Sequence, residues 1–240
     1  MSMEDEIITP RDIPYPYTTD PDEMVARFEK CYCAALYDVL SEMGYYNQWL
    51  GPEITCKTKD LKRDVVAGFA FTVQFKTGTE PIERGAYLSA IMIDTYFKNA
   101  VICIDTDHDK LGGYLGELNT NAFLRNGVRA SVIDGGGKDI GFIKLLDFPV
   151  FCKFGSPVNA FDHNHLFGWQ LPIHINDVLI EPMYVIVGDN EGVMVIPKDI
   201  VEEVLKRVED RKKQEDNTRD LIRSGMSAEQ VAIKIGYRYL

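Results

Sequence analysis

Between residues 100 and 155 the chain alternates apolar segments with amphipathic ones, and this alternation limits its fold more than any other feature. Near-continuous apolar runs predict strands at AVICID (100–105), VRASVID (128–134) and PVFCKFG (149–155). The segments between them, 113–127 and 139–147, have the apolar spacing of helices, and Gly127 is placed to cap the first. Strands of this kind, alternating with helices, favour a parallel sheet with both faces covered. The sequence therefore predicts an α/β fold.

The flanking segments extend this prediction. Residues 20–44 predict one amphipathic helix, with Asp20 as its N-cap, Pro21 as its first residue and Gly44 at its end. The remaining predicted elements are a strand at 64–75, a helix around 88–96, short strands from 171 to 197, a charged helix at 198–225 and a last helix at 227–236 that opens with the capping box SAEQ. The charged helix is most simply a solvated helix, and less often a subunit contact.

The chain of 240 residues shows no internal repeat and no linker, so a single domain is expected. We predict an N-terminal arm over 1–20, an α/β domain over 21–197 and C-terminal helices over 198–240 that pack on the domain or on a neighbouring subunit. The arm is acidic and proline-rich, so it is expected to lie extended on the body or on a neighbour.

Composition excludes several classes of function. A net charge of −11 and a pI near 4.9 oppose binding to a nucleic-acid backbone. No apolar run approaches the roughly 20 residues of a membrane span, and the N-terminus is unlike a signal peptide. The cysteines are odd in number, five, and four of them lie among apolar residues, which predicts buried thiols in a reducing cytoplasm. Cys31 and Cys33 are too close together for the usual zinc knuckle.

Three motifs suggest chemistry that their details do not support. The run DTDHDKLGGYLGE resembles a calcium loop, but Lys110 replaces the required glycine and Gly116 occupies the twelfth position. The glycines at 135–137 lack the remaining residues of a phosphate-binding loop. His163 and His165 could offer two imidazoles on one strand face, but no third ligand is in register, so loop or substrate contacts are the simpler interpretation.

The strongest functional signal is the spacing between two predicted strand ends. Glu117 opens one predicted helix, and Lys138 and Asp139 open the next, 21 and 22 positions later. Carboxyl ends of parallel strands form the ligand site of open α/β sheets, and helix N-termini present free N–H groups to anions. Two carboxylates and an ammonium there suit a divalent cation and a carboxylate ligand. The alternative is that these acids only cap helices. Tight turning with positive φ is expected of the glycines at 135–137.

This arrangement resembles the family of 4-hydroxy-4-methyl-2-oxoglutarate/4-carboxy-4-hydroxy-2-oxoadipate aldolases, which also contains the regulator of ribonuclease activity A. The family signature is Asp, twenty residues, then Arg-Asp; here it reads Glu117, twenty residues, Lys138-Asp139. The flanking segments GGYLGEL, GVRASVIDGGGKD, GDNEGVMVIP (188–197) and ALYDVLSEMG (35–44) also agree. The likeness covers most of residues 30–225. Glu117 moves its charge outward by one methylene, and Lys138 lacks the planar fork of arginine.

The resemblance implies an α-β-β-α sandwich like the phosphohistidine domain, assembled as a homotrimer or homohexamer with sites between subunits. It implies Mg²⁺ or Mn²⁺ bound directly by Asp139 and through a water by Glu117. Lys138 would lie over the 2-oxo-acid end of a small substrate. The backbone at Gly116, Leu118 and Asn119 would receive the substrate carboxylate.

Family members also complete the metal's outer shell with a glutamate from the neighbouring subunit, carried on the C-terminal helix. Counting back ten residues from Gly225 reaches Glu215, which is the candidate. The alternative is that Glu215 only pairs with Arg219 one helical turn later.

The implied reaction is class II aldol cleavage of a 4-hydroxy-2-oxo acid to pyruvate and a second carbonyl compound, with oxaloacetate decarboxylation as a companion activity. A Schiff base on Lys138 is the less favoured mechanism, because an adjacent metal-binding carboxylate would keep the amine protonated. Two further functions stay open. One is a non-catalytic, ring-shaped protein regulator, and the other is a lyase for a different hydroxy acid, suggested by the changes at Glu117 and Lys138.

Overall fold

A computed structural model describes residues 13–79 and 82–236, and it has a mixed α/β fold. Its strands are β1 (Thr55–Cys56), β2 (Val66–Thr77), β3 (Ala100–Asp105), β4 (Ala130–Gly137), β5 (Val150–Gly155), β6 (Asn164–Trp169), β7 (Ile173–Ile175), β8 (Val178–Ile180), β9 (Val185–Asp189) and β10 (Gly192–Ile196). Its α-helices are α1 (Pro21–Phe28), α2 (Cys33–Glu42), α3 (Ile82–Asp94), α4 (Glu117–Arg125), α5 (Ile140–Leu145), α6 (Val201–Arg223) and α7 (Ala228–Ile235).

The main sheet has the order β1-β5-β4-β3-β2-β9-β10, and β6 pairs with the carboxyl half of β2. Strands β2 to β5 are parallel neighbours in sequence order, as the alternating pattern predicts. Ile133 of β4 lies opposite Ile104 of β3 and Cys152 of β5, so these strands end along one edge of the sheet. The two-stranded β7–β8 hairpin is separate from this sheet.

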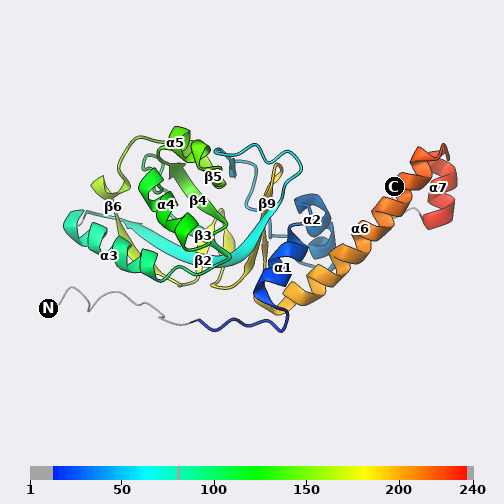
Figure 1. The fold of residues 1–240 in the computed structure, drawn as a ribbon, viewed down its shortest axis with the longest axis horizontal. Helices are drawn as coiled ribbons and strands as arrows, with labels where there is room; N and C mark the ends of the chain where they lie inside the picture. The colour runs from blue at the N-terminus through cyan, green and yellow to red at the C-terminus, as the bar shows by residue number, and fades with distance from the viewer. Residues whose placement is uncertain (1–12, 80–81, 237–240) are drawn as a thin grey trace.

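The two faces of the sheet are covered differently. Helices α3, α4 and α5 cover one face (Figure 1), where Leu88, Phe123 and Ile143 pack in one apolar cluster with Ile133. On the opposite face the β7–β8 hairpin supplies apolar side chains that pack in a second cluster with Val132 and other sheet residues. A third cluster joins α1, α2 and α6 to β9 and β10. Beyond it α6 projects away from the body and carries α7 (Figure 1).

The single helix predicted over 20–44 is wrong, because the structure has two helices there, α1 and α2, with a break between them. Asp20 caps α1 as expected, accepting from the N–H groups of Asp22 and Glu23. At Tyr32 the backbone is extended, with φ −94° and ψ 157°. The buried carboxylate of Asp189 accepts the Cys33 N–H at 2.7 Å, and the second helix starts there. A long-range hydrogen bond therefore overrides a continuous apolar pattern.

The glycines at 135–137 do not form the predicted turn. They continue β4 as buried strand residues, and none of them has a positive φ. Close packing explains them, because a Cβ on Gly136 would lie 2.4 Å from the Gly112 carbonyl oxygen and 2.7 Å from the Phe154 ring. The left-handed conformation falls instead on Asp139, with φ 52°.

Strand β6 was not predicted, although it extends the sheet by pairing with β2 from Val73 to Thr77.

Residues 1–12 of the predicted arm lie outside the described residues. In the described part, Tyr15 and Tyr17 pack their rings against Phe69, and the Thr18 hydroxyl donates to Glu202 at 2.7 Å. No helix in the described ranges is both long and apolar enough to span a membrane. The five cysteines are free, and four are buried.

Candidate active site

The structure brings the two halves of the spaced motif together. The Glu117 N–H donates to Oδ2 of Asp139 at 3.2 Å, and the Lys138 N–H donates to the Leu115 carbonyl at 2.8 Å. The carboxyl end of β4 and the amino end of α4 therefore meet at one point of the sheet edge. Glu117, Lys138 and Asp139 all lie at this point, which we call the motif site.

A loop between β3 and α4, residues 106–116, produces this meeting. It runs alongside the end of β4, where Gly113 bridges Gly136 in parallel fashion and the Tyr114 N–H donates to the Gly136 carbonyl at 3.0 Å. On its other side the Gly113 N–H donates to the Val158 carbonyl at 2.9 Å. The loop thus behaves as a short extra strand wedged between β4 and the segment after β5.

Two glycines of the loop make room for the motif side chains. A Cβ on Gly116 would lie 2.9 Å from Oδ2 of Asp139, and a Cβ on Gly113 would lie 2.9 Å from the Cβ of Lys138. Gly116 has an extended backbone, φ −113° and ψ 172°, which any residue can adopt. Space, and not backbone freedom, therefore requires glycine at position 116.

Neither acid of the motif caps the helix that it opens. Asp139 precedes α5, but its carboxylate makes no capping bond to that helix and accepts from α4 instead. The left-handed backbone of Asp139, which aspartate tolerates, turns the chain at this point. The Glu117 carboxylate contacts the side-chain amide of Asn121 one turn further along α4. The helix-capping alternative is therefore wrong for α5, whereas at α4 the Asp139 carboxylate accepts from the first N–H group of the helix.

The amino end of α4 offers free donors. Gly116 is its N-cap and has no side chain to accept from the first turn. The first intrahelical bond runs from the Thr120 N–H to the Gly116 carbonyl, so within the described part of the chain the N–H groups of Leu118 and Asn119 have no acceptor. Leu118 is 81% exposed. Such an end of a helix favours a bound anion.

The donor set suits a hard, hydrated cation better than zinc. Among residues 13–79 and 82–236 no three His, Cys, Asp or Glu side chains gather as a metal-binding group. Asp139 is an exposed residue of the motif site, and the Glu117 carboxylate contacts the side-chain amide of Asn121. Mg²⁺ keeps several waters and takes one or two carboxylates, whereas a structural zinc ion needs about four protein ligands. Lys138 forms no ion pair with any described side chain, so its charge is available to a ligand.

Glu215 lies elsewhere in the same chain. Its carboxylate accepts from the Tyr32 hydroxyl and lies 3.4 Å from the guanidinium of Arg211. Arg219 pairs with Asp216, so the expected pairing of Glu215 with Arg219 is wrong. Figure 1 places α6 beside α1 and α2, at the opposite end of the molecule from α4 and α5. A role for Glu215 at the site of a neighbouring chain stays a prediction.

Asp109 also belongs to this region, a place that the sequence did not predict for it. Its carboxylate accepts from Tyr114, from two backbone N–H groups and from His163, whose Nε2 lies 2.9 Å away. Burial alone would raise the Asp109 pKa, but these hydrogen bonds outweigh it and hold the pKa below its usual value. The sequence signal that could have indicated this role is an aspartate three residues before Gly112, where the backbone N–H groups of a turn need an acceptor. His165 does not share this contact and lies on β6 opposite Lys76.

A buried ion pair lies on the other face of the sheet. Asp134 of β4 has a fully buried carboxylate 2.5 Å from the ammonium of Lys153, and Nδ1 of His108 lies 3.9 Å away. Burial raises the pKa of Asp134, against the lowering effect of Lys153. None of the three motif residues forms an ion pair with it.

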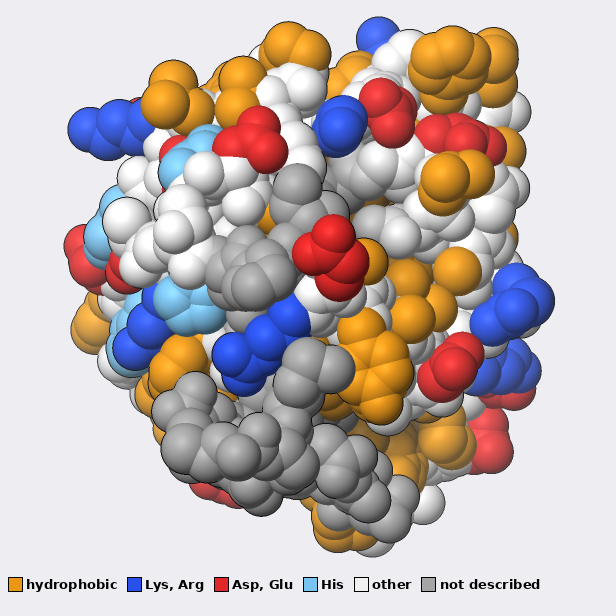
Figure 2. Space-filling model, turned by 90° about the vertical axis from the view of Figure 1, so that its left-hand side faces the viewer, with side chains coloured by type: hydrophobic (Ala, Val, Ile, Leu, Met, Phe, Trp, Pro, Cys, Tyr) orange, Lys and Arg blue, Asp and Glu red, His pale blue; other side chains and the backbone are white. Residues whose placement is uncertain are grey.

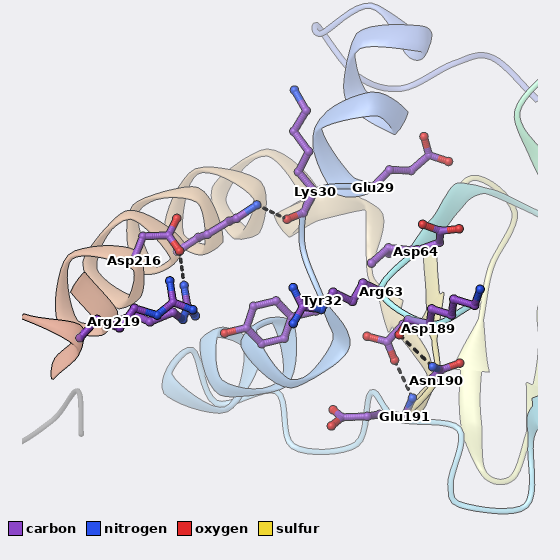
Figure 3. A pocket seen from close by; sticks show the side chains of 14 residues that line it. Glu29, Lys30, Tyr32, Arg63, Asp64, Asp189, Asn190, Glu191, Asp216 and Arg219 are labelled. Carbon is purple, nitrogen blue, oxygen red and sulfur yellow. Dashed lines mark hydrogen bonds and ion pairs between the residues drawn. The ribbon is translucent and has the colours of Figure 1, made fainter. Parts of the chain in front are cut away.

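A charged cavity of about 710 Å³ lies between α6 and the body. In Figure 3 Arg63 and Arg219 enter it from opposite sides, with Tyr32 between them. None of the three motif residues lines it. Several of its groups are engaged in holding the fold together, since Asp189 accepts from the Cys33 N–H and Lys212 donates to a backbone carbonyl. The cavity therefore lies at the junction between α6 and the rest of the domain.

Comparisons with known proteins identify the family of this chain. The family described as RraA-like: Aldolase/RraA matches residues 33–195. A Halalkalibacterium halodurans protein provisionally named 4-hydroxy-4-methyl-2-oxoglutarate aldolase is 34% identical over 165 residues, which cover 68% of this chain and 74% of that protein. Protein DlpA of Legionella pneumophila is 31% identical over 169 residues, 69% of this chain but only 27% of DlpA.

The crystal structure of Streptomyces coelicolor RraAS2, described as an unusual member of the RNase ES inhibitor RraA protein family, superposes with a TM-score of 0.74. The superposition covers 85% of this chain and 99% of RraAS2, at 21% identity, so it shows the fold alone. The likeness to the phosphohistidine domain stays a prediction. On the family match, the described fold and the motif, this chain belongs to the RraA-like (Aldolase/RraA) family.

Proposed function

We propose that this protein is a divalent-metal-dependent carbon–carbon lyase that cleaves a 4-hydroxy-2-oxo acid into pyruvate and a second carbonyl compound. One observation carries the proposal. The Asp139 carboxylate accepts from the Glu117 N–H, so Lys138, Asp139 and the free N–H groups at the start of α4 lie at one point of the sheet edge.

The substrate end common to such acids fits this set of groups. Its carboxylate would accept from the N–H groups of Leu118 and Asn119, where the α4 dipole favours an anion. Lys138, beside the same helix end, would then face the 2-oxo oxygen. Gly113 packs against the start of the Lys138 side chain, since a Cβ on Gly113 would lie 2.9 Å from the Cβ of Lys138.

Asp139, with Glu117 acting through a water, would hold Mg²⁺ or Mn²⁺, which when bound supplies positive charge to the 2-oxo end of the substrate. During cleavage the bond between C3 and C4 breaks, and its electron pair moves into the enolate of pyruvate. Lys138 stabilises the negative charge on the enolate oxygen. Glu117 accepts, through a water, the proton that the C4 hydroxyl loses as it becomes a carbonyl. Protonation of the enolate at C3 then gives pyruvate.

Oxaloacetate would yield the same enolate on losing carbon dioxide, so decarboxylation is proposed as a companion activity. Lys138 offers a compact charge in place of the fork of arginine, which weakens bidentate grip on a carboxylate. A 4-hydroxy acid without a second carboxylate near Lys138 would lose least by this change.

A neighbouring copy of the chain is proposed to border the motif site. Large apolar side chains stand exposed around it, among them Leu118 at 81%, Leu145 at 82% and Phe142 at 66%. Isolated exposed leucines are ordinary, but several near one site mark an interaction surface. Assembly as a trimer or hexamer would cover them.

The second candidate is a non-catalytic regulator that binds another protein. The fold of RraAS2, which is described as a member of an RNase inhibitor family, and the same exposed apolar side chains favour this possibility. A regulator has no need of a divalent cation, so metal dependence separates the two functions.

The test is pyruvate release, coupled to NADH oxidation by lactate dehydrogenase, over a panel of 4-hydroxy-2-oxo acids with and without Mg²⁺ or Mn²⁺. We expect release that depends on the metal, loss of it in Asp139→Ala, and its retention in Asp210→Ala, which removes an exposed aspartate of α6. Unchanged circular dichroism would show that Asp139→Ala still folds. Near-native turnover by Asp139→Ala, or no release from any substrate by the metal-loaded protein, would overturn the proposal.

A further inference from the structure

We propose that Asp109 is a positioning residue for the motif site, which it serves by holding the 106–116 loop in place. Its catalytic consequence rests on the proposed function, whereas its effect on the loop does not. Asp109 touches none of the motif residues, and it acts through the backbone that carries them.

Four donors converge on the Asp109 carboxylate. Oδ1 accepts from the Leu111 N–H at 2.9 Å. Oδ2 accepts from the Gly112 N–H at 2.9 Å and from the Tyr114 hydroxyl at 2.6 Å, and it lies 2.9 Å from Nε2 of His163. The Asp109 side chain is only 6% exposed. A buried carboxylate with this many donors fixes the path of the loop that surrounds it.

Tyr114 links this centre to the body of the protein. Its hydroxyl accepts from the side-chain amide of Asn164 at 2.6 Å, and that amide also donates to the Thr106 carbonyl at 3.1 Å. The Tyr114 ring meets the Phe75 ring edge-on, with centroids 4.9 Å apart. Both ends of the loop are therefore tied to β2 and β6, and Asp109 lies in the middle of the network.

The loop in turn sets the geometry of the motif site. The residues that follow Asp109 donate to Gly136 and accept from the Lys138 N–H, and they end at Gly116, which packs against the Asp139 carboxylate. A shift of the loop would therefore move the start of α4 relative to Lys138. Misplacements of about 1 Å cost roughly 100-fold in rate when groups must be aligned.

His163 has a defined place in this network. Its ring contacts Asp109 from the solvent side and is 32% exposed, and Figure 2 shows histidine side chains at the surface of this end of the molecule. Tyr114 and His163 are the titratable groups that contact Asp109, and Asp107 adds its charge near Tyr114. The sequence favoured loop or substrate contacts for His163, and in the structure its ring contacts Asp109.

Asp109→Asn is the direct test, because asparagine offers one acceptor oxygen to donors that converge on two. Asp107→Asn is the matched control: it makes the same charge change in the same loop, but the Asp107 carboxylate accepts from the backbone and hydroxyl of Thr77 at the end of β2. Tyr114→Phe removes one donor to Asp109, together with the acceptor of the Asn164 amide, and should give the same effect as Asp109→Asn, but weaker.

The first measurement is amide hydrogen exchange of the full chain, followed by mass spectrometry. We expect exchange at least tenfold faster in Asp109→Asn over 111–118 and 135–139, with β7 and β8 unchanged and Asp107→Asn like the wild type. The second measurement is the affinity for Mn²⁺, which we expect to fall about tenfold in Asp109→Asn and to stay unchanged in Asp107→Asn. Wild-type exchange in both segments of Asp109→Asn would overturn the proposal, and so would equal acceleration throughout the chain, which would make Asp109 a general stability residue.

The two proposals fail separately. If the wild type releases no pyruvate, the proposed function fails, but the exchange experiment still decides whether Asp109 positions the loop. If pyruvate is released, Asp109→Asn should lower kcat about ten- to 100-fold.

The pH dependence adds a check with a defined sign. The Asp109 pKa is lowered in the folded protein, so its stabilising contribution is complete above the pKa of an unfolded aspartate, about 4, and is lost as the pH falls through the lower folded value. The difference in exchange between Asp109→Asn and the wild type should therefore be large at pH 7 and shrink below about pH 4.

Discussion

Replacing Gly116 with alanine should damage the motif site while leaving the fold almost intact. The backbone of Gly116 is already extended, so alanine meets no conformational strain. Its new Cβ, however, would stand 2.9 Å from Oδ2 of Asp139 and 4.0 Å from its Cγ. Real Cβ atoms essentially never approach this closely, so the carboxylate must move.

The size of the effect follows from this distance. Reaching an ordinary contact of about 3.4 Å requires a shift of about 0.5 Å, and it weakens the 3.2 Å bond from the Glu117 N–H. Since 1 Å of misplacement costs roughly 100-fold, half that distance should cost about tenfold in kcat/KM. The stability cost should be small, about 0.5–1 kcal/mol, because alanine is a poorer N-cap than glycine.

The assay combines Mn²⁺ titration, metal-dependent pyruvate release and urea unfolding on Gly116→Ala and a control. Gly141→Ala is the control, since a Cβ there meets nothing within 4 Å and the residue lies in the neighbouring helix α5. The control should keep activity and gain up to about 1 kcal/mol of stability from helix propensity. Native Mn²⁺ affinity and rate in Gly116→Ala would refute the idea that position 116 makes room for the Asp139 carboxylate. A loss of several kcal/mol would show that the residue serves the fold instead.

Two further predictions concern charges proposed to meet the substrate or the metal. Lys138→Arg should tighten binding of a 2-oxo acid or shift its specificity, and Lys138→Ala should lose most of the rate; borohydride trapping of substrate on Lys138 would support a Schiff base instead. If Glu215 acts in a neighbouring chain, inactive Glu215→Ala and Asp139→Ala chains should regain partial activity when reassembled together. An active Glu215→Ala protein, or no recovery in confirmed mixed oligomers, would leave Glu215 as the partner of Tyr32 and Arg211.

Short-range patterns predicted most of the secondary structure. The strand expected at 100–105 has those bounds as β3, and the capping box at Ser227 and Gln230 opens α7 as expected. These features depend on residues within a few positions of each other. The break between α1 and α2 depends on Asp189, a residue distant in sequence, so helical periodicity could not reveal it.

The motif site was predictable in outline because its spacing follows from the parallel sheet. Neighbouring parallel strands end at one edge, so the alternation predicts that Glu117 and Asp139, which follow such strands, lie near each other. The network around Asp109 was not predictable, since it combines residues from the loop and from β6, a strand that carries no clear alternating pattern.

The left-handed backbone conformation of Asp139 explains why this aspartate follows so closely after the glycines at 135–137. Glycines 135–137 let the loop and Phe154 lie against the strand, and they do so in ordinary extended conformations. The change of direction is left to Asp139, whose φ of 52° turns its carboxylate away from α5 and toward the start of α4. Close packing and turning are therefore assigned to different residues. Because the residue that turns the chain is also the proposed cation ligand, the backbone conformation itself aims the carboxylate at the α4 N-terminus.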